Sequence, residues 1–246
     1  MIERVGPNVV GLAAGDPGLM SFGSCGGCAE CQRGSPGYCN DFGNINMFGQ
    51  RLGGSALRYR GAHFFVQSAF ATHAIATAHN VVKVAPELPL ATLAPFGCGI
   101  QTGAGAILNT LAPAVGTTIA IFGTGAVGLA AVMAAKLVGC TTIIAIDLGK
   151  ERLAVAREIG ATHIIDAGSD EVLNQIADIT GRGAHFSLDT TGNPAAVTLS
   201  INCLRQRGCS AQVAAPPRGT QSFDEINRSI EEMESGAVIK PVLLMD

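Results

Sequence analysis

The chain has 246 residues, of which 48% are apolar and 14% are charged. This composition is sufficient for a packed core and excludes an intrinsically disordered chain. The formal net charge of −3 gives no basic surface of the kind that neutralises a nucleic-acid backbone, so we expect no nucleic-acid partner. No residue between Glu87 and Lys136 is charged, but prolines and glycines interrupt this stretch. Its longest clean run, Ala126–Ala135, is too short to cross a bilayer, so we expect no membrane segment.

The first residues, Met1–Arg4, contain no apolar h-region and no cleavage-site pattern, so nothing indicates export. We therefore predict a cytoplasmic protein. In a reducing compartment, clustered cysteines more often bind metal than form disulfides.

Four of the eight cysteines follow the pattern Cys25-x-x-Cys28-x-x-Cys31-x7-Cys39. Glycines between them let backbone amides turn towards the sulfur atoms. Four thiolates fill the tetrahedral shell of Zn²⁺ and leave no position for a substrate, so the pattern predicts a structural zinc site. Surface thiols or a disulfide pair are the alternatives, and an iron–sulfur cluster is another, although its usual spacings differ.

The region around these cysteines, from Val9 to Val84, has weak periodicity and frequent turns. Short β-like runs occur at His63–Val66 and Val81–Val84. From Thr117 to Ala214, apolar strands alternate with amphipathic helices, which is typical of βαβ units in a parallel sheet. The expected strands are Thr118–Phe122, Thr142–Ile146, His163–Ile165, Phe186–Leu188 and Ala211–Ala214. The tail predicts one helix, Phe223–Gly236, followed by an extended run, Val238–Leu243.

A glycine motif, Gly123-x-Gly125-x-x-Gly128, directly follows the predicted strand Thr118–Phe122. In this context the first glycine makes the turn, the second admits a pyrophosphate, and the third lets a helix pack on the strand. The motif therefore predicts a dinucleotide-binding site. A purely structural tight turn is the alternative.

The same loop opens a predicted helix, Ala126–Leu137, whose first residues, Ala126 and Val127, would face the phosphates with unpaired N–H groups. Asp147 ends the next strand, nineteen residues after Gly128, where a carboxylate would accept hydrogen bonds from the ribose and repel a 2′-phosphate. No arginine follows Asp147, and Lys150 lies three residues on. We therefore predict NAD as the cofactor, although Asp147 could instead be a surface turn residue.

The segment Pro95–Gly103, with the sequence Pro-Phe-Gly-Cys-Gly-Ile-Gln-Thr-Gly, lies between the cysteine-rich region and the glycine motif. Together these three features resemble the zinc-dependent medium-chain alcohol dehydrogenases, and within that family the aryl-alcohol (benzyl-alcohol) dehydrogenases. The resemblance implies that Cys98 is a ligand of the catalytic zinc and that Thr102 lies beside the nicotinamide. On residue type alone, a single Cys among apolar residues is more often a buried small hydrophobe.

Further similarity to the family lies in Asp189–Gly192, Phe223–Asn227 and Gly236–Val242, so the resemblance covers nearly the whole chain. It implies that Thr191 lines the cofactor cleft. The implied fold is α/β, a Rossmann-type parallel sheet with a partial, β-rich GroES-like catalytic domain that carries a structural zinc lobe. The expected domains are the partial catalytic domain at 1–90 with its zinc lobe at 25–39, an incomplete NAD-binding domain at 91–220, and a segment at 221–246 returning to the catalytic domain.

Two features of the family are missing from this sequence. The family also binds its catalytic zinc through an N-terminal cysteine segment and a Gly-His-Glu segment, whereas this chain opens at Val5–Val9, which resembles the stretch after them. A second discontinuity near Thr220–Ser222 indicates a lost internal block, which would leave the sheet short of a strand with an exposed edge. No histidine stands in the family's ligand context, so we interpret all five as structural or surface residues: His63, His73, His79, His163 and His185.

By resemblance the chain is a zinc-dependent oxidoreductase that transfers hydride between a primary alcohol, including aromatic alcohols, and NAD. Its expected partners are an alcohol or aldehyde substrate and further copies of itself, as a dimer or tetramer. A non-catalytic remnant that binds dinucleotide and zinc is the alternative. A zinc-ribbon interaction protein is disfavoured because a ribbon leaves the nucleotide-binding half unexplained.

We predict little or no turnover of benzyl alcohol with NAD⁺ by this chain when it is purified and zinc-replete. The reason is that Cys98 supplies one of the three protein ligands that a catalytic zinc requires. Extension at the N-terminus with a homologous Cys and Gly-His-Glu segment should restore turnover. Robust activity of the unextended chain would contradict the prediction.

Overall fold

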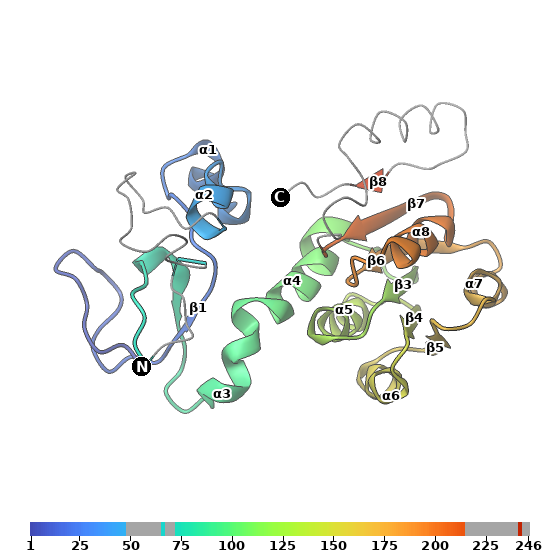
Figure 1. Cartoon of the computed structure of the whole chain (residues 1–246), viewed down its shortest axis with the longest axis horizontal. Coiled ribbons are helices and arrows are strands. Elements are labelled where there is room, and N and C mark those ends of the chain that lie inside the picture. Colours follow the sequence, from blue (N-terminus) through green and yellow to red (C-terminus); the bar gives the residue numbers. More distant parts are fainter. Residues whose placement is uncertain (48–64, 67–71, 215–240, 243–246) are drawn as a thin grey trace. The chain divides into compact units, whose positions relative to one another are not determined.

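The computed structural model describes residues 1–47, 65–66, 72–214 and 241–242. It divides into two compact units, Met1–Cys98 and Gly99–Met245 (Figure 1). The helix expected at Phe223–Gly236 lies outside the described residues. None of the helices within the described ranges combines the length and apolar character needed to cross a bilayer.

The first unit contains a small antiparallel sheet in which β1 (Gly18–Met20) pairs with β2 (Val81–Lys83). This pairing confirms the extended run expected at Val81–Val84. An ion pair of 2.7 Å between Lys83 Nζ and Asp16 Oδ1 ties β2 to the turn before β1. Short helices complete the described part of the unit: α1 (Ala29–Gln32), η1 (Pro36–Tyr38), α2 (Phe42–Asn46), η2 (Ala78–Asn80), α3 (Leu90–Leu93) and η3 (Ala94–Gly97).

The strand expected at His63–Val66 is wrong for its last two residues. Phe65 and Val66 lie in a turn with φ angles of 50° and 70°, which are outside the extended region. The first two residues of that run lie outside the described part of the chain.

The second unit is a parallel sheet with the strand order β5-β4-β3-β6-β7-β8 (Figure 1). Its strands are β3 (Thr118–Phe122), β4 (Thr142–Asp147), β5 (His163–Asp166), β6 (Ala184–Asp189), β7 (Leu204–Gln212) and β8 (Pro241–Val242). Its helical segments are α4 (Gly99–Gly105), the π-helix η4 (Ala106–Leu111), α5 (Ala126–Leu137), α6 (Lys150–Ile159), α7 (Val172–Thr180) and α8 (Pro194–Asn202). The predicted α/β class with a parallel sheet is confirmed.

Alternate side chains of the central strands pack into two separate cores. Ile119 and Ile121 of β3 lie in one cluster with residues of η4, α5 and α6, whereas Ala120 and Phe122 lie in another with residues of α7 and α8. Both faces of the sheet are therefore covered, which explains why these strands read as continuous apolar runs. This arrangement brings the carboxyl ends of β3, β4 and β6 to one edge.

Strand β7 begins seven residues before the expected start at Ala211. Its first half includes the charged residues Arg205 and Arg207 and is only partly buried, so it lacks the apolar run of the central strands. Backbone pairing with β6, interrupted by a register shift between Ala184 and Phe186, defines this part of the strand.

The outer edge of β7, which we expected to be exposed, is partly covered by the tail of the chain. Pro241 pairs with Ser210, and Val242 pairs with Ala211, in parallel register. The expectation of an open edge is therefore wrong for these two residues of β7. Pro241 is compatible with this pairing because β8 is the last strand in the sheet order, and proline in sheets is confined to edge strands.

Helix α4 packs closely on α5 through two glycines. A Cβ atom on Gly103 would lie 2.0 Å from the carbonyl oxygen of Val127 and 3.0 Å from Cβ of Ala130. A Cβ on Gly99 would lie 3.3 Å from Cβ of Ala126. The absence of side chains at these glycines allows α4 to pack against the first turn of α5, the part of that helix expected to face the cofactor.

We predict that Gly103→Ala lowers the free energy of unfolding by about 1–3 kcal/mol, because the new methyl group overlaps the Val127 carbonyl. Gly105→Ala, on the same helix, is the matched control. A Cβ there meets nothing closer than 3.9 Å, so the change should stabilise the helix by about 0.5–1 kcal/mol. Equal unfolding midpoints for the two variants in urea would contradict the close packing.

Candidate functional site

The four cysteines of the predicted zinc site meet in the first unit. The sulfur atoms of Cys25, Cys28, Cys31 and Cys39 all lie within 4.8 Å of one another, and all four cysteines are free thiols. Cys25 Sγ and Cys31 Sγ are 3.9 Å apart. A tetrahedral zinc with bonds of 2.3 Å would separate its sulfurs by about 3.8 Å. The donor set and its spacing therefore fit a four-thiolate zinc.

The backbone around the cysteines is shaped to turn amides towards sulfur. Gly26 has a φ of +71°, and Cys28 is the N-cap of α1. The N–H of Cys28 donates to Cys25 Sγ at 3.3 Å, and the N–H of Cys25 donates to Cys39 Sγ at 3.3 Å. Amide donors of this kind stabilise thiolates, the form that binds zinc.

The pKa values of two of these thiols, Cys28 and Cys31, are shifted in opposite directions. Backbone N–H groups of Asn40 and Cys31 lower the pKa of Cys28 to about 6. Burial, with the neighbouring Cys28 thiolate, raises the pKa of Cys31 to about 11. Cys28 therefore ionises more readily than Cys31.

Asn46 closes the base of this lobe and was not singled out in the sequence. Its fully buried side chain accepts from the N–H of Gly23 at 2.8 Å and donates to the Gly23 carbonyl at 2.9 Å. It also donates to the carbonyl of Phe42 at 3.0 Å. These bonds join α2 to the chain entering the cysteine pattern. A lone Asn in a polar stretch carries no pattern that could have revealed this role.

The three glycines of the nucleotide motif have different surroundings in the second unit. Gly123 directly follows β3 and has a φ of +86°. A Cβ on Gly128 would lie 1.8 Å from the Gly123 carbonyl oxygen, whereas a Cβ on Gly125 would meet nothing within 4 Å. These are the turn, the close helix–strand contact and the open position that dinucleotide binding requires. Ala126 and Val127 follow as the first residues of α5.

The loop after β6 lies directly beside the glycine motif. Thr190 Oγ1 donates to the carbonyls of Phe122 and Gly123, at 3.0 and 3.2 Å. Thr191 follows, and its hydroxyl donates to the fully buried carboxylate of Asp189 at 2.7 Å. The structure therefore brings Thr191 to the predicted cofactor edge, and Thr190 is a neighbour that sequence analysis did not single out.

Asp147 lies at the carboxyl end of β4, beside the same loop, and its side chain is 8% exposed. Its Oδ2 accepts from the N–H and hydroxyl of Thr124, at 2.6 and 2.9 Å, and its Oδ1 accepts from the N–H of Gly149 at 2.8 Å. Burial opposes ionisation, but the hydrogen bonds from Gly149 and Thr124 and the charge of Arg152 outweigh it and lower the pKa. A buried ionised carboxylate is thus available at the sheet edge.

The expectation that no arginine follows Asp147 is wrong. Arg152, in the first turn of α6, places Nη1 4.0 Å from Asp147 Oδ1. Lys150 is exposed on the first turn of the same helix. The first turn of α6 follows closely after the end of β4, so these residues lie near that strand end in the fold. Their separation from Asp147 along the sequence did not indicate this.

Cys98 and Thr102 lie on either side of the boundary between the two units. Cys98 is exposed at the end of η3, so the interpretation as a buried apolar cysteine does not hold. The preceding residue is held to β1, because Ser21 Oγ donates to the Gly97 carbonyl at 2.8 Å. Thr102 is half-buried on α4.

Cys98 belongs to no cluster of metal ligands within the described ranges. There, the cysteines of the zinc lobe are the only His, Cys, Asp or Glu side chains that gather in a group of three or more. His73, which bonds Glu3 at 3.0 Å, is exposed. The ring of His185 contacts the Thr118 N–H and Arg205, and burial together with the charge of Arg205 lowers its pKa. The exposure of His73 and the contacts of His185 agree with the surface or structural roles expected for these two histidines; His63 lies outside the described residues.

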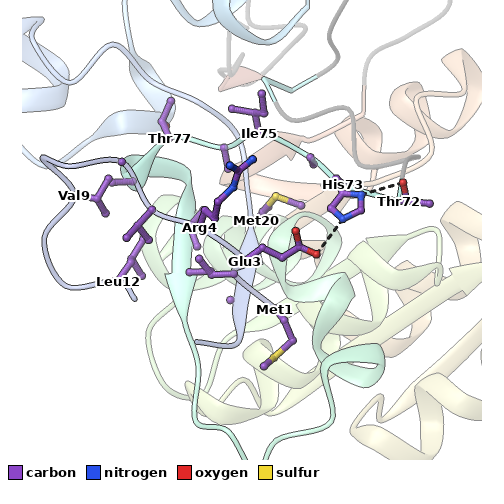
Figure 2. A pocket seen from close by; sticks show the side chains of 18 residues that line it. Met1, Glu3, Arg4, Val9, Leu12, Met20, Thr72, His73, Ile75 and Thr77 are labelled. Atoms are coloured by element: carbon purple, nitrogen blue, oxygen red, sulfur yellow. Dashed lines mark hydrogen bonds and ion pairs between the residues drawn. The ribbon is translucent and has the colours of Figure 1, made fainter. Parts of the chain in front are cut away.

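A cavity of about 750 Å³ opens in the first unit, between the N-terminal residues and the segment that leads into β2 (Figure 2). Figure 2 shows Arg4 and the exposed pair of Glu3 and His73 along it. None of the residues predicted to bind zinc, nucleotide or substrate lines this cavity.

Comparison with known families agrees with both units. Residues 1–86 match the alcohol dehydrogenase GroES-like domain, and residues 126–233 match the zinc-binding dehydrogenase family.

Among curated proteins, a probable alcohol dehydrogenase from a Pseudomonas species is 40% identical over 227 residues, covering 89% of this chain and 71% of the relative. Geraniol dehydrogenase from Castellaniella defragrans is 41% identical over 222 residues, covering 87% and 60%. The chain thus spans about three-fifths of the length of that relative.

Among solved structures, benzyl alcohol dehydrogenase from Acinetobacter calcoaceticus matches with a TM-score of 0.83 and 34% identity. An alcohol dehydrogenase zinc-binding domain protein from Burkholderia ambifaria matches with a TM-score of 0.81 and 37% identity. Each match covers 97% of this chain and 80% of the solved one.

We predict that Cys28→Ser lowers bound zinc by about one equivalent per chain, because it removes one of four sulfurs that close the coordination shell. The variant should also be more sensitive to proteolysis within residues 25–39. Cys209→Ser, a half-buried thiol on β7, is the control and should keep the parental zinc content. Unchanged zinc in Cys28→Ser, measured by elemental analysis, would refute the assignment.

Proposed function

Because this chain belongs to the zinc-dependent alcohol dehydrogenase family, we propose that it binds NAD(H) at a site of the kind that serves hydride transfer between an alcohol and that cofactor. The geometry at the carboxyl edge of the parallel sheet carries the proposal. There Gly125 leaves open space at the start of α5, and the ionised Asp147 stands nineteen residues beyond Gly128. Unpaired N–H groups at a helix start suit a pyrophosphate, and a carboxylate at the next strand end suits a ribose.

In the proposed reaction the nicotinamide supplies the hydride acceptor. The residues of this chain bind and orient it: the loop at Gly123–Gly128 receives the pyrophosphate, and Thr191 lines the cleft near the β6 end. Thr102 is proposed to lie beside the nicotinamide. Lys150, exposed at the start of α6, is close enough in sequence to Asp147 to contact the adenosine end.

Zinc enters this proposal in two ways. The cysteines of residues 25–39 suit a structural zinc, which stabilises the lobe and takes no part in the reaction. A catalytic zinc acts as a Lewis acid on an alcohol oxygen in metalloenzymes. Within the described residues Cys98 is the single ligand proposed for it, which is insufficient to hold such an ion, so no catalytic step is assigned to zinc here.

A second candidate function follows from that isolation of Cys98. A protein with the structural zinc and the dinucleotide site but no second zinc would bind cofactor without turnover. Zinc stoichiometry separates the two functions: two zincs per chain support the enzyme, and one supports the non-catalytic binding protein.

The substrate class is proposed from relatives whose names specify geraniol and benzyl alcohol, both primary alcohols with an unsaturated carbon skeleton. We infer that a primary alcohol, including an aromatic one, and its aldehyde are the substrates. We further propose a cytoplasmic homo-oligomer, a dimer or a tetramer.

We predict that the chain binds NADH more tightly than NADPH, because the carboxylate of Asp147 repels a 2′-phosphate. Asp147→Ala should reduce the ratio of the NADH affinity to the NADPH affinity by about tenfold or more. Asp166→Ala is the matched control, since Asp166 ends the neighbouring strand in register with Asp147. Calorimetric titration of the zinc-replete parent chain and of both variants measures their affinities for NADH and for NADPH. Equal affinity of the parent chain for both nucleotides would exclude the proposed role of Asp147.

A further inference from the structure

Thr124, between the first two glycines of the nucleotide motif, is fully buried and bonds a single group twice. Its backbone N–H and its hydroxyl both donate to Asp147 Oδ2, at 2.6 and 2.9 Å. The dinucleotide motif leaves this position free to vary, so nothing in the motif requires a hydroxyl there. The side chain of Thr124 therefore adds a contact that the glycine motif alone does not provide.

Counting acceptor positions shows what this contact does to Asp147. Each carboxylate oxygen accepts about two hydrogen bonds, so the two bonds from Thr124 fill Oδ2. Oδ1 accepts one bond, from the N–H of Gly149 at 2.8 Å. One acceptor position therefore remains, on Oδ1, and it is the position available to a ribose hydroxyl.

Arg152 competes for the same carboxylate. Its Nη1 is 4.0 Å from Oδ1, which is beyond a direct hydrogen bond, and its side chain is 65% exposed. If Oδ2 lost the Thr124 hydroxyl, a second acceptor position would open and the carboxylate could rotate towards the guanidinium. A carboxylate paired with Arg152 would repel a 2′-phosphate less and would accept from a ribose less well.

We propose that Thr124 is a positioning residue for cofactor choice, holding Asp147 so that Oδ1 faces the adenosine ribose and Arg152 stays apart. The inference rests on the proposed function, namely that this sheet edge binds NAD(H). It assigns discrimination between NADH and NADPH to a pair, Thr124 with Asp147, and not to the carboxylate alone. The alternative is that Thr124 only joins the ends of β3 and β4. Loss of its hydroxyl would then weaken the binding of all nucleotides equally.

The test compares Thr124→Val, which removes the hydroxyl at nearly constant volume, with Thr124→Ser, which retains it. Thr190→Val is the matched control, because that hydroxyl bonds loop carbonyls and not Asp147. The probes are NADH, NADPH and 2′-deoxy-NADH, titrated into full-length zinc-replete protein by calorimetry. Nicotinamide fluorescence is a second readout, undisturbed by tryptophan because the chain has none.

We expect Thr124→Val to bind NADH about tenfold more weakly. This is the factor given by loss of one hydrogen bond from the ribose hydroxyl to the charged carboxylate of Asp147. NADPH binding should stay the same or become tighter, because a carboxylate paired with Arg152 repels the 2′-phosphate less. Thr124→Ser should bind both nucleotides like the parent chain. The parent and Thr124→Val should bind 2′-deoxy-NADH equally, because the hydroxyl through which Thr124 acts is missing. Thr190→Val should weaken all three nucleotides by a similar factor.

Equal loss of NADH and NADPH binding in Thr124→Val, or failure of Thr124→Ser to restore it, would overturn the inference while leaving the proposed function intact. Absence of binding of either nucleotide to the parent chain would instead overturn the proposed function, and the inference with it. If Thr124→Val does not fold, Thr124→Ala removes the same hydroxyl with less volume and must give the same selective loss.

Discussion

The contact between Gly128 and the carbonyl oxygen of Gly123 is the constraint on which the proposed cofactor site depends. A side chain at Gly128 would place its Cβ 1.8 Å from that oxygen, so α5 can approach β3 this closely only with glycine there. The contact sets the first turn of α5 at the sheet edge, beside open space at Gly125. Asp147 and Thr190 then lie against the same loop through bonds to Thr124, Phe122 and Gly123.

Much of the second unit follows from local sequence pattern. Helix Ala126–Leu137 and strand Thr118–Phe122 were predicted with the bounds that the structure has, because glycines and an apolar run mark both. The cysteines of the zinc lobe were also predicted from the sequence, because their spacing directly constrains how four thiolates can surround one ion. Strand β7 was predicted to start seven residues too late, because its first half is mostly polar and partly exposed and is defined by pairing with β6 rather than by burial.

Contacts between different strands, helices and loops could not be predicted from the sequence. The bonds from Thr124 to Asp147 join residues twenty-three positions apart, and those from Asn46 to Gly23 join residues equally far apart. Arg152 was overlooked because only the fold of the first turn of α6 brings its side chain near Asp147, and the sequence alone does not show this proximity. Polar side chains of common types carry no period or spacing, so their roles emerge only when the sheet brings strand ends together.

The central claim is that the open space at Gly125 receives the cofactor's pyrophosphate. Gly125→Val tests it most directly, because a Cβ there meets no protein atom within 4 Å and the backbone φ of −73° accepts a side chain. The measurement is NADH affinity alongside the thermal unfolding midpoint. The account predicts an affinity reduced by more than about tenfold, with a midpoint lowered by only a few degrees. Unchanged affinity in the folded variant would contradict it.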